Sequence, residues 1–174
     1  NDLPAGGDDS IVVAVIDSGV DYNHPDLTAN MWVNTQEIPA NGIDDDENGF
    51  VDDIHGVSVL SENYSHSGDP IDDNGHGTHV AGIAAGEKNN VGMHGAAFDA
   101  KIAVAKVSSG YQYSFGNARQ AAAWGRDKGS VAINVSAEQN YDTGFRNSIV
   151  KKADGDYYST HWYYGVNGYN GSVQ

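Results

Sequence analysis

Hydrophobic residues along the chain gather in a few short runs, and polar, glycine-rich segments separate them. Residues 11–16, Ile-Val-Val-Ala-Val-Ile, form an unbroken run that is rich in β-branched side chains. Segments 100–109 and 130–136 have a similar composition. Runs of this length and type are typical of strands buried on both faces of a parallel sheet, so each segment predicts one such strand.

Two helices are expected around these strands. Residues 114–129 place small and apolar side chains at helical spacing, with a serine to cap the start and a glycine to end it. Residues 79–86 predict a second helix. Its glycines each cost roughly 1 kcal/mol relative to alanine, so we expect them to pack closely against a neighbouring element. The alternation of strands and helices predicts an α/β fold: a doubly wound, mostly parallel sheet with helices on both faces.

Length, charge and cysteine content narrow the possible functions. The 174 residues suffice for a single domain, which we expect to span 1–174. The chain has 24 acidic and 9 basic residues, a formal net charge of -15, which argues against nucleic acid as a partner and favours bound cations. The longest purely apolar run is far shorter than the roughly 20 residues of a membrane span, so no membrane partner is expected. The chain has no cysteine, which excludes disulfides and thiolate metal ligands. The sequence leaves the oligomeric state of the protein open.

Two titratable residues occupy positions where an α/β sheet gathers functional groups. Asp17 follows the first predicted strand, and such sheets bind ligands outside the carboxyl ends of their strands. His76 opens the segment of the small-residue helix. A buried carboxylate beside an imidazole fixes the tautomer of the ring and stabilises its protonated form. The pair therefore suits two members of a nucleophilic triad, in which the histidine acts as base and acid near neutral pH.

Each residue also has a simpler interpretation. An Asp-Ser-Gly sequence after a strand can begin a turn, and His76 can be a surface or capping histidine. A different chemistry is a metallohydrolase in which Asp72, His76 and His79 bind zinc.

The residues around this pair resemble a known family. Residues 13–27, VAVIDSGVDYNHPDL, and 74–86, NGHGTHVAGIAAG, resemble the Asp and His motifs of the subtilisin-like serine proteases, the subtilases. The resemblance continues through 89–107 and 131–136 and is strongest over 11–136. It implies that His76 is the catalytic base, that Asp17 orients it, and that His79 is not the proton carrier. It also implies polypeptide substrates and a serine-type endopeptidase activity.

An acidic segment suggests a calcium site. Within residues 41–53, NGIDDDENGFVDD, oxygen-bearing side chains alternate and a glycine follows, as in the first half of an EF-hand loop. The expected ligands are Asp44, Asp46, Asn48, the carbonyl of Phe50, Asp52 and Asp53. His55 stands where an EF-hand has its bidentate glutamate, so a complete helix–loop–helix is not expected. The alternative is a solvated acidic loop without an ion.

The subtilase resemblance implies a second calcium site and an extracellular location. In the family, residues at the positions of Asp26 and Asn90 help to hold a structural calcium ion. Calcium sites of modest affinity are saturated at extracellular but not cytosolic concentrations, so we expect a secreted protein.

One part of the family pattern is absent. The nucleophilic serine of subtilases lies in a Gly-Thr-Ser-x-Ala motif, which does not occur in the 174 residues, and neither does the asparagine motif of the oxyanion hole. Three explanations are open: a fragment of a longer protease, a pseudoenzyme that keeps the fold and the calcium, or a tail altered after about residue 140. All three predict that the 174-residue chain alone hydrolyses peptides poorly, and the second predicts a non-catalytic calcium-binding module.

Overall fold

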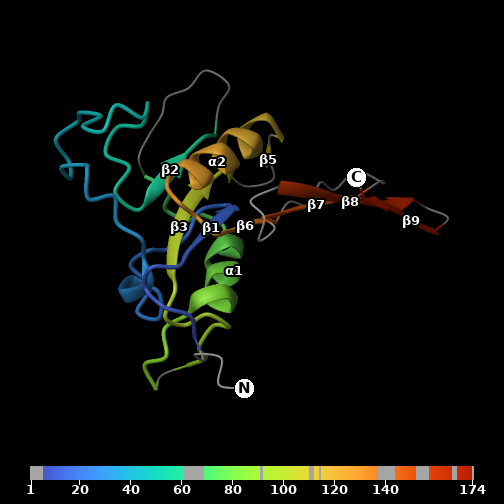
Figure 1. The fold of residues 1–174 in the computed structure, drawn as a ribbon, viewed down its shortest axis with the longest axis horizontal. Coiled ribbons are helices and arrows are strands. Elements are labelled where there is room, and N and C mark those ends of the chain that lie inside the picture. Colours follow the sequence, from blue (N-terminus) through green and yellow to red (C-terminus); the bar gives the residue numbers. More distant parts are fainter. Residues whose placement is uncertain are drawn as a thin grey trace.

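A four-stranded parallel sheet forms the centre of the molecule (Figure 1). The computed structural model describes residues 6–60, 69–90, 92–109, 112–113, 115–136, 144–151, 157–165 and 168–173. The strands lie in the order β2-β3-β1-β6, and each neighbouring pair is parallel. Their bounds are Val12–Asp17 for β1, Gly56–Ser58 for β2, Lys101–Lys106 for β3 and Ala132–Val135 for β6.

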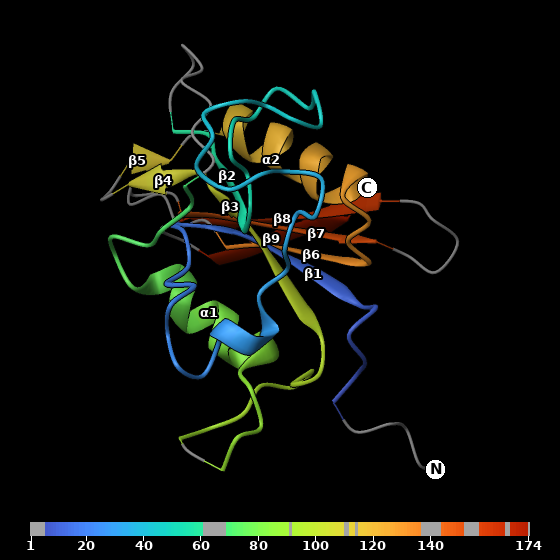
Figure 2. The same ribbon diagram turned by 90° about the vertical axis from the view of Figure 1, so that its left-hand side faces the viewer.

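Two helices cover opposite faces of this sheet (Figure 2). Helix α1 spans His76–Ala85, and helix α2 spans Phe115–Asp127. A short 3-10 helix, Thr28–Asn30, follows β1. The fold is therefore the doubly wound α/β arrangement that the alternating strand and helix patterns predict. None of the helices in the described part of the chain has the length and apolar character needed to cross a bilayer.

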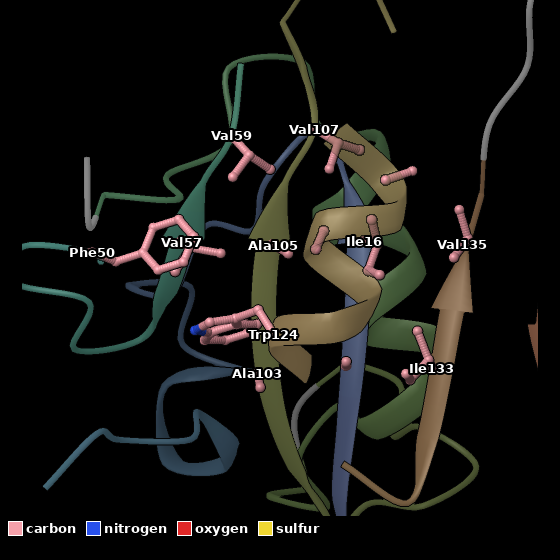
Figure 3. Packing of buried hydrophobic residues seen from close by; sticks show 13 residues of the cluster. Ile16, Phe50, Val57, Val59, Ala103, Ala105, Val107, Trp124, Ile133 and Val135 are labelled. Atoms are coloured by element: carbon pink, nitrogen blue, oxygen red, sulfur yellow. The ribbon is translucent and has the colours of Figure 1, made fainter. Parts of the chain in front are cut away.

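The alternation of side chains along β1 explains why the strand is apolar throughout. Ile16 faces α2 and packs in the same cluster as Trp124 (Figure 3). Ala14 belongs to this cluster as well, whereas Val15 faces α1 and packs in the cluster that contains Ala81. All five of these side chains are buried. Both faces of the sheet thus contribute to the core, and the position of each helix is fixed by burial of apolar surface at about 25 cal/mol per Å².

The C-terminal part forms strands that the hydrophobic pattern did not predict. Strands β7 (Gly144–Lys151), β8 (Tyr157–Gly165) and β9 (Gly168–Val173) pair as a three-stranded antiparallel sheet. Strands β4 (Ser108–Ser109) and β5 (Gln112–Tyr113) form a two-stranded ribbon. The aromatic content of residues 157–164 is the sequence signal for a strand, because aromatic residues favour pleated structure even without alternation.

Candidate active site

The last residue of β1 contacts the first residue of α1. His76 Nδ1 lies 2.7 Å from Asp17 Oδ1, and the backbone N–H of Ser18 donates to the same oxygen at 2.7 Å. Asp17 is 3% exposed, whereas the His76 side chain is 56% exposed. Donation to Asp17 requires the proton on Nδ1, which leaves Nε2 of the neutral ring as the basic nitrogen. The pair therefore presents a half-exposed base whose other nitrogen is held by a buried carboxylate.

A buried lysine fixes the loop that leads to His76. Lys106 is the partner of Asp17 in the β1–β3 register and is 5% exposed. Its ammonium group donates to the carbonyl of Ile71 at 2.7 Å and lies 3.1 Å from Asp73 Oδ2. Hydrogen bonds from Ser109 and Lys106 lower the pKa of Asp73. The loop before α1 is thus anchored to the carboxyl end of β3.

The alternative zinc set is not assembled. Among the described residues, Asp72, His76 and His79 do not form a group with ligand atoms close enough to share an ion. Both oxygens of Asp72 instead accept hydrogen bonds, from Ser18 and Thr78 among others. The geometry therefore favours proton transfer at His76 over metal ligation.

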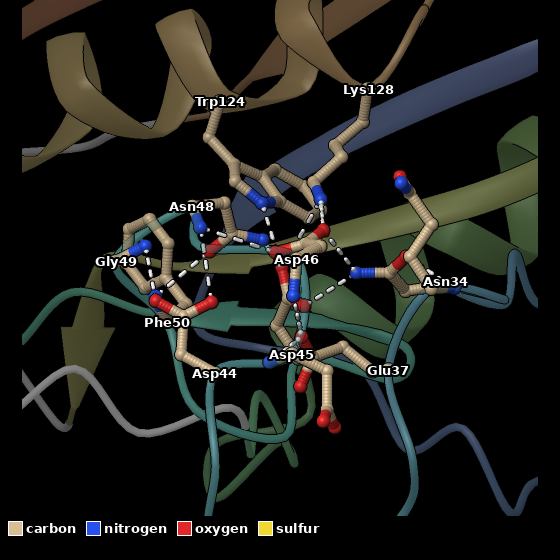
Figure 4. Close-up of polar contacts among 12 residues, drawn as sticks. Asn34, Glu37, Asp44, Asp45, Asp46, Asn48, Gly49, Phe50, Trp124 and Lys128 are labelled. Atoms are coloured by element: carbon tan, nitrogen blue, oxygen red, sulfur yellow. Dashed lines mark hydrogen bonds and ion pairs between the residues drawn. The ribbon is translucent and has the colours of Figure 1, made fainter.

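A second polar centre lies between the acidic segment and α2. Oxygens of Glu37, Asp46 and Asp53 lie within 4.8 Å of one another. We call these three residues the acidic group. Figure 4 shows Trp124, from α2, and Lys128, from the turn after it, reaching toward this group. Lys128 pairs with Asp46 and lies 3.8 Å from Asp53, and Trp124 Nε1 donates to Asp53 at 3.1 Å.

The acidic group holds more negative charge than its protein partners neutralise. Three carboxyl groups face one ammonium group, all largely shielded from water. Burial raises the pKa of Asp53, and the hydrogen bonds it accepts from Asn34 and Trp124 do not offset that rise. Burial also acts to raise the pKa of Asp46, but hydrogen bonds from Lys128 and Asn34 outweigh it and lower the pKa. A set of buried carboxylate oxygens with excess negative charge fits the chemistry of a hard cation such as Ca²⁺.

Comparisons with known proteins decide the family. The model of the subtilase family matches residues 8–168. The chain belongs to the subtilase family. It is 48% identical to a subtilisin-like protease 1 of Plasmodium vivax over 97 residues. These residues make up 55% of this chain and 15% of that protein. It is 33% identical over 131 residues to a halolysin-like extracellular serine protease of Natrialba magadii, covering 75% of this chain and 21% of that protein.

Solved structures agree with this assignment. An epidermin leader peptide processing serine protease from Staphylococcus aureus matches with a TM-score of 0.51 and 25% identity, over 83% of this chain and 29% of that one. The subtilase chain thus spans well under two thirds of the length of the relatives it matches.

The expected calcium ligands of this subtilase occupy different environments. Only Asp46 and Asp53 of the predicted set join the acidic group. Asp44 accepts the backbone N–H groups of Asn48 and Gly49, and Asp52 accepts those at residues 41 and 42. The side chain of Phe50 is buried in the core on the α2 face. These interactions shape the loop around the acidic group.

At the position of the second predicted calcium site, the neighbour of Asp26 is Asn89. Asn89 donates from Nδ2 to Asp26 Oδ1 at 3.0 Å. Asn90, which the family resemblance pointed to, adopts a left-handed backbone conformation with φ 65°. The described structure thus places Asn89 against Asp26, with Asn90 at the turn.

Glu37 and Lys128 are the site residues that sequence reasoning did not assign. Glu37 accepts the backbone N–H groups of residues 45, 46 and 52, so it organises the acidic segment from outside it. The only sequence signal for Glu37 is an acidic residue shortly before an acidic run. The pairing of Lys128 with Asp46, 82 positions away, has no local signal in the sequence.

Proposed function

We propose that the protein is a serine-type endopeptidase of the subtilase class and that this chain carries the aspartate and the histidine of its catalytic triad. The observation that supports this most strongly is the contact between the buried Asp17 and the exposed ring of His76, within motifs that resemble those of the family. We further propose that residues 1–174 belong to one catalytic domain and that the substrates are polypeptides.

In the proposed mechanism, Nε2 of His76 accepts the proton of a serine hydroxyl supplied from outside the 174 residues. The serine oxygen then forms a bond to the carbonyl carbon of the substrate peptide. Asp17 keeps the imidazole in the Nδ1–H tautomer and stabilises the imidazolium that forms. His76 returns the proton to the departing amine as the carbon–nitrogen bond breaks, and a water molecule then hydrolyses the acyl-enzyme by the same steps.

We also propose that the acidic group binds calcium. Glu37, Asp46 and Asp53 supply oxygen ligands, and the neighbouring expected ligands, Asp44, Asn48, Phe50 and Asp52, belong to the same loop. Asp26 with the adjacent Asn89 and Asn90 is proposed as a second site. When bound, calcium would neutralise buried charge and stabilise the folded state alone.

An extracellular location follows from the calcium proposal. Calcium at extracellular concentration would fill sites of modest affinity. The name of the Natrialba magadii relative describes an extracellular protease, which supports a secreted subtilase here as well.

The test of the proposed function uses the full-length protein and His76→Ala. We expect loss of nearly all peptide hydrolysis in this variant with the circular dichroism spectrum unchanged. His94→Ala, at an exposed histidine in the loop after α1, is the matched control and should retain activity. A serine-directed phosphonofluoridate should inhibit the parent protein, and phenanthroline should not. Unchanged turnover in His76→Ala would reject the assignment.

A non-catalytic calcium-binding module is the second candidate, because the 174 residues contain no Gly-Thr-Ser-x-Ala sequence. The gene downstream of Gln174 separates the two: a Gly-Thr-Ser-x-Ala sequence supports the peptidase, and a stop codon supports the module. A full-length protein that binds calcium but neither turns over peptides nor reacts with the phosphonofluoridate would also support the module.

A further inference from the structure

Helix α1 begins at His76 without a local cap. The preceding residue, Gly75, is in the left-handed conformation with φ 92° and has no side chain to accept a hydrogen bond. The first N–H groups of a helix have no partner within the helix, so they need acceptors from elsewhere. The N–H of Gly77 donates to Ser18 Oγ at 3.0 Å, and that of Thr78 donates to Asp72 Oδ2 at 3.0 Å. The cap is therefore supplied by Ser18, 59 positions before Gly77, and by Asp72, 6 positions before Thr78.

The carboxylate of Asp72 connects these acceptors. Its Oδ1 accepts the Ser18 hydroxyl at 2.9 Å and the Asn74 N–H at 3.0 Å. Its Oδ2 also accepts the Thr78 hydroxyl, whose oxygen in turn accepts the Asp21 N–H at 2.9 Å. A negative charge at this end of α1 also interacts favourably with the helix dipole. Asp72 thus joins the turn after β1 to the first turn of α1.

The strand end and the helix start are therefore joined twice. The direct connection is the hydrogen bond that Asp17 Oδ1 accepts from the Nδ1–H group of His76. Indirectly, Ser18, which follows Asp17 in the chain, is joined through its hydroxyl to Asp72 and to the N–H of Gly77, which follows His76. Two connections between adjacent residue pairs restrict both the separation and the relative rotation of the two backbones.

We propose that Asp72 is the positioning residue that holds the imidazole of His76 on Asp17. The need for such a residue follows from exposure: the His76 side chain is 56% exposed, so few contacts restrain its rotamer. Rotation away from Asp17 would gain side-chain conformational entropy, which opposes a single hydrogen bond. Asp72 acts through Ser18, Gly77 and Thr78 by fixing the backbone from which the ring extends.

The effect of Asp72 on catalysis rests on the proposed function, but its effect on the Asp17–His76 hydrogen bond does not. The first measurement is therefore the NMR resonance of the His76 Nδ1–H proton in the full-length protein labelled with ¹⁵N-histidine. We expect at least about tenfold faster exchange of this proton with water in Asp72→Asn, because the amide cannot accept all the bonds of the carboxylate. Amide protons of Val15 and Val104, in the buried sheet, should keep their protection. Asp127→Asn, the same charge change at an exposed position of α2, should alter neither.

A second variant, Ser18→Ala, tests the same connection if Asp72→Asn does not fold. Ser18→Ala removes the hydroxyl that joins Asp72 to Gly77 and keeps the backbone donor to Asp17, so it should also speed exchange at His76 with the sheet intact. In the full-length peptidase, either variant should lower kcat by up to about 10²-fold with little change in KM. Unchanged His76 exchange in both folded variants, or loss of sheet protection in both, would overturn the proposal. A protein without peptidase activity would reject the proposed function while the NMR result still decided the role of Asp72.

Discussion

Gly77 packs directly against the carbonyl oxygen of Gly19. A Cβ atom on Gly77 would lie 2.0 Å from that oxygen and 3.0 Å from the Cβ of Asp17. Helix α1 can therefore begin beneath the turn after β1 only if this position has no side chain. The absence of bulk beside His76 is thus a requirement of the contact between Asp17 and His76.

Substituting Gly77 should disrupt this contact, whereas substituting another glycine of α1 should not. We expect Gly77→Ala to lower the free energy of unfolding by about 1–3 kcal/mol through overpacking against backbone that cannot move away. Gly82→Ala is the matched control, because a Cβ there meets no described atom within 4 Å. It should raise the free energy of unfolding by about 0.5–1 kcal/mol. Urea unfolding measures both, and similar effects of the two substitutions would contradict this account.

Removing the ammonium group of Lys128 from the acidic group should lower the free energy of unfolding. Lys128→Ala leaves Asp46 and Asp53 buried without their ammonium partner, and we expect a loss of about 3–5 kcal/mol in chelator-treated protein. Arg126→Ala breaks an exposed pair with Asp127 and should change stability by less than about 1 kcal/mol. Calcium should restore stability to Lys128→Ala more than to the parent. Equal, small losses in the two variants would show that Lys128 does not compensate the acidic group.

Calcium binding should depend on Glu37, which the sequence pattern did not include. Calorimetric titration of Glu37→Gln should give at least about tenfold weaker binding than the parent, because the substitution removes a carboxylate from the buried oxygen set. Glu47→Gln, at an exposed glutamate of the same loop, is the control. If the two variants bind calcium equally well, the ion is not held by the acidic group.

Stability should depend on pH with opposite signs at two carboxyl groups. Burial acts to raise the pKa of Asp72, but hydrogen bonds from Thr78, Asn74 and Gly75 lower it below its ordinary value of 3.8. Its contribution is therefore present above 3.8 and lost as the pH falls through the pKa of the folded state. The pKa of Asp53 is raised by burial, so its contribution is largest below 3.8 and is lost as the pH rises through the folded value.

The measurement is urea unfolding at pH values on both sides of 3.8. The stability of Asp72→Asn should fall less steeply with acid than that of the parent. As the pH rises above 3.8, the free energy of unfolding of Asp53→Asn should fall less than that of the parent. Parallel pH profiles for the parent and both variants would refute these assignments.

Local patterns were sufficient to predict three of the four strands of the parallel sheet and both helices, whereas β2 was not predicted. The apolar run at 11–16 became β1, shifted by one residue to Val12–Asp17, and α1 began at His76. These elements are set by burial and by turn residues that lie within the same segment. The expectation that the glycines of the helix predicted over 79–86 pack closely was right for Gly86, which follows α1 and meets Gly95, and wrong for Gly82.

The rest of the site depends on contacts between distant segments. One acceptor in the cap of α1 is Ser18, 59 positions before Gly77, and the ammonium group that pairs with the acidic group belongs to Lys128, 82 positions after Asp46. No periodicity along the chain encodes such pairs. The alternation within 41–53 identified the acidic segment, but the choice of Asp46 and Asp53 over Asp44 and Asp52 depends on which side chains face α2.

The dependence of peptide hydrolysis on the carboxylate of Asp17 tests the central claim most directly. In the full-length protein, Asp17→Asn keeps the size of the side chain but no longer enforces the Nδ1–H tautomer of His76, so kcat should fall by about 10⁴-fold while the protein remains folded. Asp127→Asn should leave kcat unchanged. A folded Asp17→Asn protein with the kcat of the parent would contradict the account.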